Sequence, residues 1–211
     1  MDELILKIQR AVSQPLPGWD AHKKMINYIR PKATDVEKVD PEARHGAVLA
    51  LLYPKNNEPH VALMLRNTYK GTHSGQVSFP GGKRELRDKD LIETALREAH
   101  EEMNIQPEQV TVMGALSKVY IPPSRFLVSP FIGYSQSRPD FIPDPLEVAE
   151  IIEAPLRLIL KESSIKEKPI YVQVTNSELD VKYFDILGHT VWGATAMMLK
   201  ELAEMLNDQN H

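Results

Sequence analysis

The sequence predicts an α/β fold in which a mixed β-sheet lies between helices and a helical extension precedes the sheet. Short continuous apolar runs, typical of buried strands, alternate with segments whose apolar residues follow the helical period. A chain of 211 residues with 42% hydrophobic content can bury a sizeable core as one compact unit. We therefore expect a helical extension over residues 1–45 and a core domain over residues 46–211.

The extension is expected to hold two helices. Apolar residues at helical spacing predict the first over residues 2–12. The second is predicted from about Asp20 to Ile29, because Pro31 stops it. This segment is too apolar for a free linker, so the extension is expected either to pack on the core or to form a contact in a homodimer.

The core is expected to contain several strands and two later helices. Apolar runs bounded by turn residues predict the strands. The expected strands are Ala47–Tyr53, His60–Leu65, Val110–Tyr120, Phe126–Tyr134, Val148–Ile152 and Ile170–Val174. The later helices are expected at residues 155–160 and 190–206.

Between these elements, three glutamates share one stripe of a helix that follows a Gly-Gly turn. At about 100° per residue, Glu102 lies roughly 40° to one side of Glu98 and Glu101 roughly 60° to the other. The opposite face carries the apolar residues that are expected to anchor the helix: Ile92, Leu96, Ala99 and Met103. The acids are therefore expected to point away from the core.

Such an acidic stripe is suited to a metal ion. Like charges at these spacings repel by about 0.2–0.5 kcal/mol per pair, which favours a compensating cation. Oxygen ligands select a hard one, Mg²⁺ or Mn²⁺. The alternative is an exposed helix face whose glutamates interact only with water. Gly81 and Gly82 favour the metal site, because they lack side chains that would block a close approach of the backbone.

The segment from residue 82 to residue 105 resembles the signature box of the Nudix hydrolases. The matching positions are Gly82, Arg97, Glu98, Glu101, Glu102 and Ile105. The resemblance implies an α/β/α sandwich and a hydrolase of diphosphate bonds. It also implies that the three glutamates and the backbone carbonyl of Gly82 bind Mg²⁺ or Mn²⁺. Arg97 is implied to pair with a carboxylate of the box and to hold the loop against the helix.

The chain departs from this box in the loop and at the end of the helix. Fourteen residues separate Gly82 from Arg97, one more than in the standard box, so the early glutamate of the box has no direct counterpart. Asp88 and Asp90 are the nearest carboxylates, and we favour Asp90 as a helix N-cap because a glutamate follows it by three residues. Asn104 replaces a glycine, and asparagine is the next best residue for a left-handed helix end.

A catalytic base is sought among the glutamates. Nudix enzymes differ in this respect, since some use a glutamate of the box and others use one from a later loop. Glu147 and Glu150 are the later candidates in this sequence. The alternative for both is a solvent-facing strand edge.

A second segment resembles the element that marks the coenzyme A pyrophosphatase branch of the family. Arg66, Gly75 and Phe79 keep the spacing of that element. Three positions depart from it: Met64, Asn67 and Gly71. Gly71 replaces a second arginine, and the adjacent Lys70 is the candidate to supply its charge, although lysine cannot form the bidentate contact of a guanidinium.

The resemblance implies hydrolysis of coenzyme A (CoA) or its derivatives to 3′,5′-ADP and 4′-phosphopantetheine. The expected substrate contacts are Arg66, Lys70, His73, Gly75, Phe79 and Lys83. The departure at Gly71 keeps open a Nudix pyrophosphatase for another conjugate, such as ADP-ribose or a dinucleotide. A Nudix module that binds nucleotides without turnover is a further alternative, which the complete set of glutamates disfavours.

Composition argues against other classes of function. A net charge of −4 without a dense basic tract argues against a nucleic-acid binder. No stretch approaches the roughly 20 apolar residues of a membrane span, and the N-terminus lacks the basic start of a signal peptide. The absence of cysteine excludes disulfides and fits the reducing cytoplasm, where we expect the protein to act on a small-molecule nucleotide diphosphate.

Overall fold

A mixed β-sheet forms the centre of the molecule. The structure is a computed structural model that describes all residues except 28–29, 69–74, 173–176 and 208–211. β1 (Arg44–Lys55) runs through the middle of an eight-stranded sheet, antiparallel to β2 (Glu58–Arg66) and parallel to β7 (Phe126–Tyr134). The predicted mixed sheet is therefore confirmed.

Shorter strands complete this sheet. They are β3 (Val77–Ser78), β4 (Gly81–Lys83), β5 (Thr111–Ala115), β6 (Val119–Ile121) and β8 (Val148–Pro155). β3 and β8 pair with β2, β5 and β6 pair with β7, and β4 pairs with β1. The pairing of β4 with β1 places the Gly-Gly turn beside the central strand.

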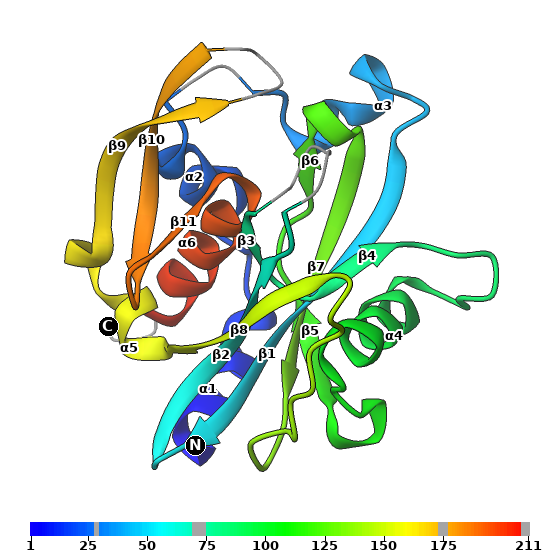
Figure 1. Cartoon of the computed structure of the whole chain (residues 1–211), viewed down its shortest axis with the longest axis vertical. Coiled ribbons are helices and arrows are strands. Elements are labelled where there is room, and N and C mark those ends of the chain that lie inside the picture. The colour runs from blue at the N-terminus through cyan, green and yellow to red at the C-terminus, as the bar shows by residue number, and fades with distance from the viewer. Residues whose placement is uncertain (28–29, 69–74, 173–176, 208–211) are drawn as a thin grey trace.

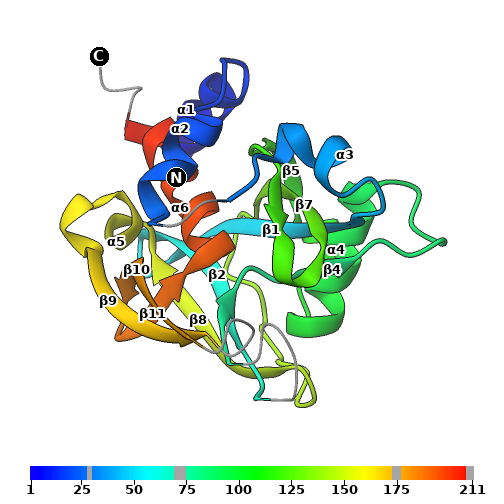
Figure 2. The ribbon, with the colours of Figure 1, turned by 90° about the horizontal axis from the view of Figure 1, so that it is seen from above.

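Helices cover both faces of the sheet (Figure 1). α4 (Leu91–Met103) lies on one face, whereas α6 (Gly193–Asn207) and α1 (Asp2–Val12) lie on the other, as the view from above also shows (Figure 2). Side chains of β1 alternate between two apolar clusters: Leu49 and Leu51 lie in the cluster of α4, and Ala50 and Leu52 in that of α6. This arrangement is the α/β/α sandwich that the Nudix resemblance implies.

A smaller antiparallel sheet lies beside α6. It consists of β9 (Ile165–Val172), β10 (Ser177–Ile186) and β11 (His189–Trp192), in the order β11-β10-β9. Phe184 and Val191 of this sheet join the apolar cluster that contains α6.

The remaining helical elements are short. They are α2 (Gly18–His22), α3 (Val36–Val39), α5 (Leu156–Leu160) and the 3₁₀ turns η1 (Lys23–Met25), η2 (Ala33–Asp35), η3 (Pro107–Gln109), η4 (Pro122–Ser124) and η5 (Glu162–Ser164). No helix in the described part of the chain is long and apolar enough to cross a membrane.

Some element boundaries predicted from the sequence are wrong. The strand predicted over Val110–Tyr120 is two strands, because the chain leaves the sheet after β5 and the Ser117 N–H donates to Glu201 instead. The helix predicted from residue 190 begins at Gly193, because residues 190–192 pair with β10 as part of β11. β10 is missing from the predicted strands, because its polar start gives no strand signal in the sequence. The second helix of the extension is shorter than predicted, since α2 ends at His22 and η1 follows it.

A buried carboxylate on α6 holds the extension against the core. Glu201 is fully buried, and its Oε2 lies 2.8 Å from His22 Nε2. It also accepts hydrogen bonds from the backbone N–H of Gly18 and of Ser117, each at 3.1 Å. Burial raises the pKa of Glu201, but the interactions with His22 and Ser117 together outweigh this effect, so the pKa lies below its usual value. One side chain thus joins α2, α6 and the loop after β5.

We expect Glu201→Ala to lower the free energy of unfolding by about 3–5 kcal/mol, because it leaves several buried donors without an acceptor. Urea unfolding followed by circular dichroism measures the change. Glu162→Ala is the matched control: the Glu162 side chain is 78% exposed and its partner Lys200 keeps an ion pair with Glu204 at 3.3 Å, so about 0–1 kcal/mol is expected. Equal small losses in the two variants would contradict this role of Glu201.

Candidate active site

Both ends of α4 are fixed by caps that the sequence predicts. At the N-terminus, Asp90 Oδ1 accepts the Glu93 N–H at 2.9 Å. At the C-terminus, Asn104 adopts the left-handed conformation, with φ of 57°. The favoured reading of Asp90 as an N-cap and the tolerance of Asn104 in place of glycine are both confirmed.

Asp88 is the carboxylate that pairs with Arg97. The guanidinium binds it through two bonds, Nε–Oδ1 at 2.8 Å and Nη2–Oδ2 at 3.0 Å. Asp88 is buried and also accepts from the Thr94 hydroxyl and the Glu85 N–H. The hydrogen bonds from Arg97 hold the pKa of Asp88 far below its usual range. Arg97 was expected to pair with a carboxylate of the box and to hold the loop against the helix, and its pair with Asp88 ties the loop with its extra residue to α4.

Glu98 lies against the Gly-Gly turn. A Cβ added to Gly82 would stand 2.5 Å from Glu98 Oε2, so only glycine leaves room for this carboxylate. Glu98 Oε1 accepts from Arg97 Nη1 at 2.8 Å. Burial raises the pKa of Glu98 against the effect of Arg97.

Glu102 is buried, and the expectation that all three acids point away from the core is wrong. Its side chain is 3% exposed. Glu102 follows Ala95 by seven residues, or about two helical turns, so the two share a stripe, and both are buried against the sheet. Ile92, which was expected on the apolar face, is instead 36% exposed. The buried face is thus rotated toward Glu102.

Two partners satisfy the Glu102 carboxylate. Its Oε2 accepts the Gly81 N–H at 2.8 Å, and its Oε1 accepts Arg66 Nη1 at 2.9 Å. Burial raises the pKa of Glu102 to about 8, and the charge of Arg66 and the Gly81 N–H oppose this shift. The negative charge of nearby Glu98 also contributes to the raised value.

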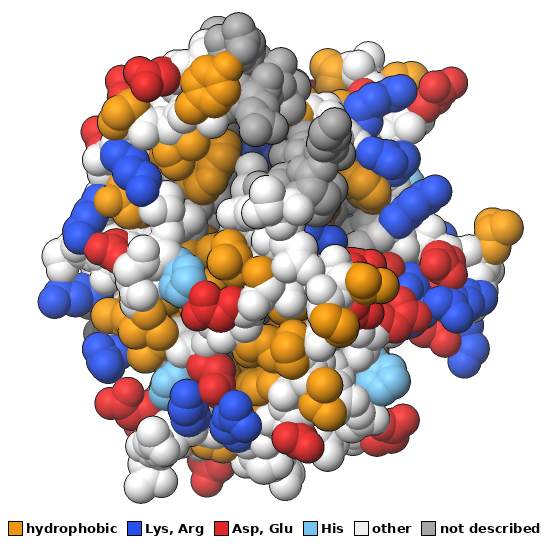
Figure 3. Space-filling model, in the orientation of Figure 1, with side chains coloured by type: hydrophobic (Ala, Val, Ile, Leu, Met, Phe, Trp, Pro, Cys, Tyr) orange, Lys and Arg blue, Asp and Glu red, His pale blue; other side chains and the backbone are white. Residues whose placement is uncertain are grey.

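Glu101 lies at the solvent side of the stripe. Its carboxylate accepts from Arg87 and Arg97, each at 3.0 Å, and it is 47% exposed. Figure 3 shows acidic and basic side chains gathered on this side of the molecule, over the β4–α4 loop and α4. In the part of the chain that the structure describes, no three His, Asp or Glu side chains converge in a geometry ready to hold a metal ion. Arginines occupy the carboxylate oxygens instead.

The donor set nevertheless fits a hard divalent cation. It consists of carboxylates alone, and two of them, Glu98 and Glu102, contact the backbone of the Gly-Gly turn. The Gly82 carbonyl is not oriented as expected: it lies toward β1, 2.7 Å from where a Cβ on Gly46 would stand. Successive peptide groups of a strand face opposite sides, and the Gly81 N–H faces Glu102, so the Gly81 backbone borders the acids. The sequence does not distinguish these two glycines.

The two later glutamates lie in different surroundings. Glu147 Oε2 accepts from Arg66 Nη2 at 3.2 Å, and its charge contributes to the raised pKa of Glu98. Glu150 instead lies 3.3 Å from His189 Nε2 of β11. It pairs in the sheet with Leu65, whose side chain packs in the cluster of α6 and not in that of α4. Glu150 thus contacts β11, whereas Glu147 contacts Arg66, which favours Glu147 of the two candidates for the catalytic base.

The expected substrate contacts divide into three groups. Arg66 borders the acids, and Lys83 is exposed on β4, where its backbone carbonyl accepts from Arg97. Phe79 is 1% exposed in the core and is not available to a substrate, which corrects that prediction. Gly75 adopts φ of 64° in a turn, and Lys70 and His73 lie outside the described residues.

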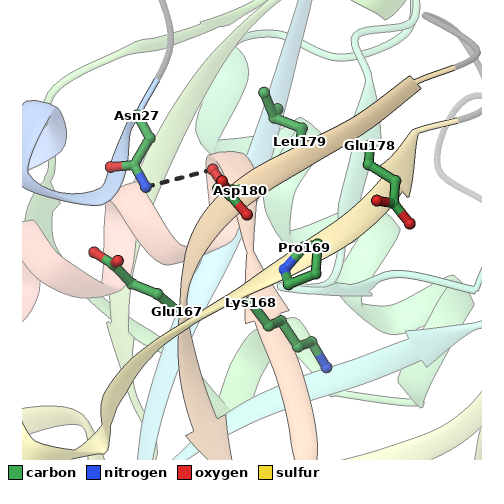
Figure 4. Close-up of a pocket in the computed structure, with 7 residues that line it drawn as sticks. All are labelled: Asn27, Glu167, Lys168, Pro169, Glu178, Leu179 and Asp180. Carbon is green, nitrogen blue, oxygen red and sulfur yellow. Dashed lines mark hydrogen bonds between the residues drawn. The ribbon is translucent and has the colours of Figure 1, made fainter.

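A separate hollow lies on the smaller sheet (Figure 4). Its lining residues are Asn27, Glu167, Lys168, Pro169, Glu178, Leu179 and Asp180. Asn27 donates to the Asp180 carbonyl at 3.4 Å, while Lys168 Nζ lies 2.6 Å from the Thr190 hydroxyl. None of the acids of α4 lines this hollow, and it carries side chains of both charges.

Comparisons with known proteins agree with this site and fold. The chain matches the model of the NUDIX domain over residues 43–168. It is 36% identical over 165 residues to the Nudix hydrolase NudL of Photorhabdus laumondii, covering 77% of this chain and 85% of that relative. It is 32% identical to the mitochondrial Nudix hydrolase 15 of Arabidopsis thaliana, covering 84% of this chain and 63% of the relative. The solved structure of the Nudix hydrolase RenU from M. smegmatis aligns with a TM-score of 0.55 at 19% identity, over 79% of this chain and 87% of RenU.

The sandwich and its acidic helix beside a Gly-Gly turn define the class, a hydrolase of diphosphate bonds. The family match covers more than half of the chain, and the protein belongs to the Nudix family. It is a Nudix hydrolase that acts on a nucleoside diphosphate-linked substrate. Divalent metal ions are typical of this family.

We expect Gly82→Ala to weaken Mn²⁺ binding at least about tenfold, because its Cβ displaces the Glu98 carboxylate. The flexible end of Glu98 can move, so the free energy of unfolding should change by less than about 1 kcal/mol. Isothermal titration with Mn²⁺ and urea unfolding measure the two effects. In the double variant Gly82→Ala/Glu98→Ala, the loss should equal that of Glu98→Ala alone. Fully additive losses would contradict this explanation.

Proposed function

We propose that this protein hydrolyses the diphosphate bond of CoA or its derivatives, giving 3′,5′-ADP and 4′-phosphopantetheine. The observation that carries the proposal is the position of Arg66. This arginine matches the CoA pyrophosphatase element, and its guanidinium lies 2.9 Å from the buried acid Glu102. A planar guanidinium beside an acidic metal site is well suited to bind a phosphate oxygen.

The strand pairing supports the proposal, because it gathers the parts of this element. β2 ends at Arg66 and pairs with β3, with Met64 opposite Ser78, and the Gly-Gly turn follows at once. Lys83 lies exposed on the next strand. CoA carries a 3′-phosphate as well as its diphosphate, so more than one basic side chain is needed to bind it.

The acids and Glu147 are proposed to divide the chemistry. Glu98, Glu101 and Glu102, together with the backbone at Gly81, would hold Mg²⁺ or Mn²⁺. When bound, such a cation neutralises phosphoryl oxygens and helps to activate water near neutral pH. Glu147, half-exposed beside Arg66, is proposed to accept the proton of the attacking water. The water oxygen bonds to one phosphorus, the bond from that phosphorus to the bridging oxygen breaks, and the bridging oxygen leaves on the other phosphate.

Mass spectrometry of the products tests this function. Purified protein is incubated with Mg²⁺ and either CoA, ADP-ribose or NADH, with EDTA as the control. We expect 3′,5′-ADP and 4′-phosphopantetheine from CoA, formed faster than AMP from the other two. Glu101→Gln and Glu102→Gln should each reduce turnover about 100-fold or more, whereas Glu108→Gln, an exposed glutamate of η3, should not change it.

Other outcomes would replace the proposal. AMP from ADP-ribose or NADH without cleavage of CoA would keep the Nudix chemistry and identify a different conjugate as substrate. Nucleotide binding without turnover of any of the three would favour the binding module. The homodimer and the cytoplasmic location stay predictions.

A further inference from the structure

Arg66 connects three elements at the acidic site. It ends β2, and its side chain is 19% exposed. One guanidinium nitrogen binds Glu102 on α4 at 2.9 Å, and another binds Glu147, just before β8, at 3.2 Å. The guanidinium thus lies between a buried acid and one that is 53% exposed.

The charge of Arg66 stabilises the buried Glu102 more than it stabilises the half-exposed Glu147. Glu102 is 3% exposed, and a buried carboxylate without a counter-charge is strongly unfavourable. Apart from Arg66, the donor to the Glu102 carboxylate in the described part of the chain is the neutral Gly81 N–H. Glu147 can interact with water, so its pair with Arg66 contributes little to stability.

A cation that binds Glu102 must compete with Arg66. Both seek the carboxylate oxygens, and two positive charges at such short range repel each other. Arg97 differs from Arg66, because it contacts Glu98 and Glu101 through Nη1 while Nε and Nη2 stay bound to the buried Asp88. The contact of Arg66 with Glu102 is made by a single guanidinium nitrogen.

We propose that Arg66 is the resident counter-charge of Glu102, that a divalent cation displaces it, and that the displaced guanidinium is then available to a substrate phosphate. The half-exposed Glu147 offers it a partner on the solvent side once Glu102 binds the cation. This inference rests on the proposed metal site, but not on CoA as the substrate. It makes cation binding and phosphate binding mutually favourable, because the first releases the group that the second uses.

The test is the affinity for Mn²⁺ of the full chain without nucleotide, measured by isothermal titration. Arg66→Gln removes the competing charge and should bind Mn²⁺ about fivefold more tightly than the unaltered protein, or more. Arg66→Lys keeps a positive charge and should gain less than Arg66→Gln. Arg84→Gln is the matched control: it removes one positive charge from the β4–α4 loop, where the Arg84 guanidinium donates to the backbone carbonyls of Asp88 and Lys89. We expect its Mn²⁺ affinity to stay within about twofold.

Folding gives a second readout, because Arg66→Gln leaves Glu102 without its counter-charge. We expect this variant to unfold more easily than the unaltered protein in EDTA, and Mn²⁺ to restore its stability. If the variant does not fold in EDTA, its recovery on refolding with Mn²⁺ supports the proposal, and failure to recover overturns it.

Other results distinguish failure of the counter-charge role of Arg66 from failure of the proposed metal site. Mn²⁺ binding by the unaltered protein with equal or weaker binding by Arg66→Gln would overturn the counter-charge role and leave the metal site intact. Absence of Mn²⁺ binding in the unaltered protein would overturn both.

Discussion

The burial of one carboxylate constrains the whole site. Glu102 lies against the sheet, where only a hydrogen bond or an opposite charge can compensate for lost hydration. The Gly81 N–H supplies the first and Arg66 the second, and they come from β4 and β2. The positions of these strands relative to α4 are therefore tied to the chemistry of the acid.

The surrounding scaffold keeps the neighbouring acids in place with few interactions. Asp90 and Asn104 fix the ends of α4, and the pair of Arg97 with Asp88 holds the preceding loop against the helix. Gly82 leaves room for the Glu98 carboxylate beside the turn. The caps and the ion pair each depend on a specific side chain, whereas the room for Glu98 depends on the absence of a side chain at Gly82. Together these features bring the acids to one edge of the central strand.

Much of this could be predicted from local signals in the sequence. Helical period, caps and the spacing of the box identify α4, the Gly-Gly turn and the acids, because these features depend on neighbours in the chain. The burial of Glu102, the side-chain direction of Glu150 and the core position of Phe79 depend on contacts between distant strands, and no local pattern reports them. β11 resembles the start of a helix because Thr190–Trp192 continue the apolar spacing of α6, and only their pairing with β10 makes them a strand.

A crystal structure with Mn²⁺, analysed by anomalous diffraction at the manganese edge, tests the central claim most directly. The account predicts an anomalous peak about 2.0–2.3 Å from carboxylate oxygens of Glu98 and Glu102, with the Arg66 guanidinium moved off Glu102. A peak elsewhere, or no peak at a saturating Mn²⁺ concentration, with the Arg66–Glu102 pair intact would contradict it.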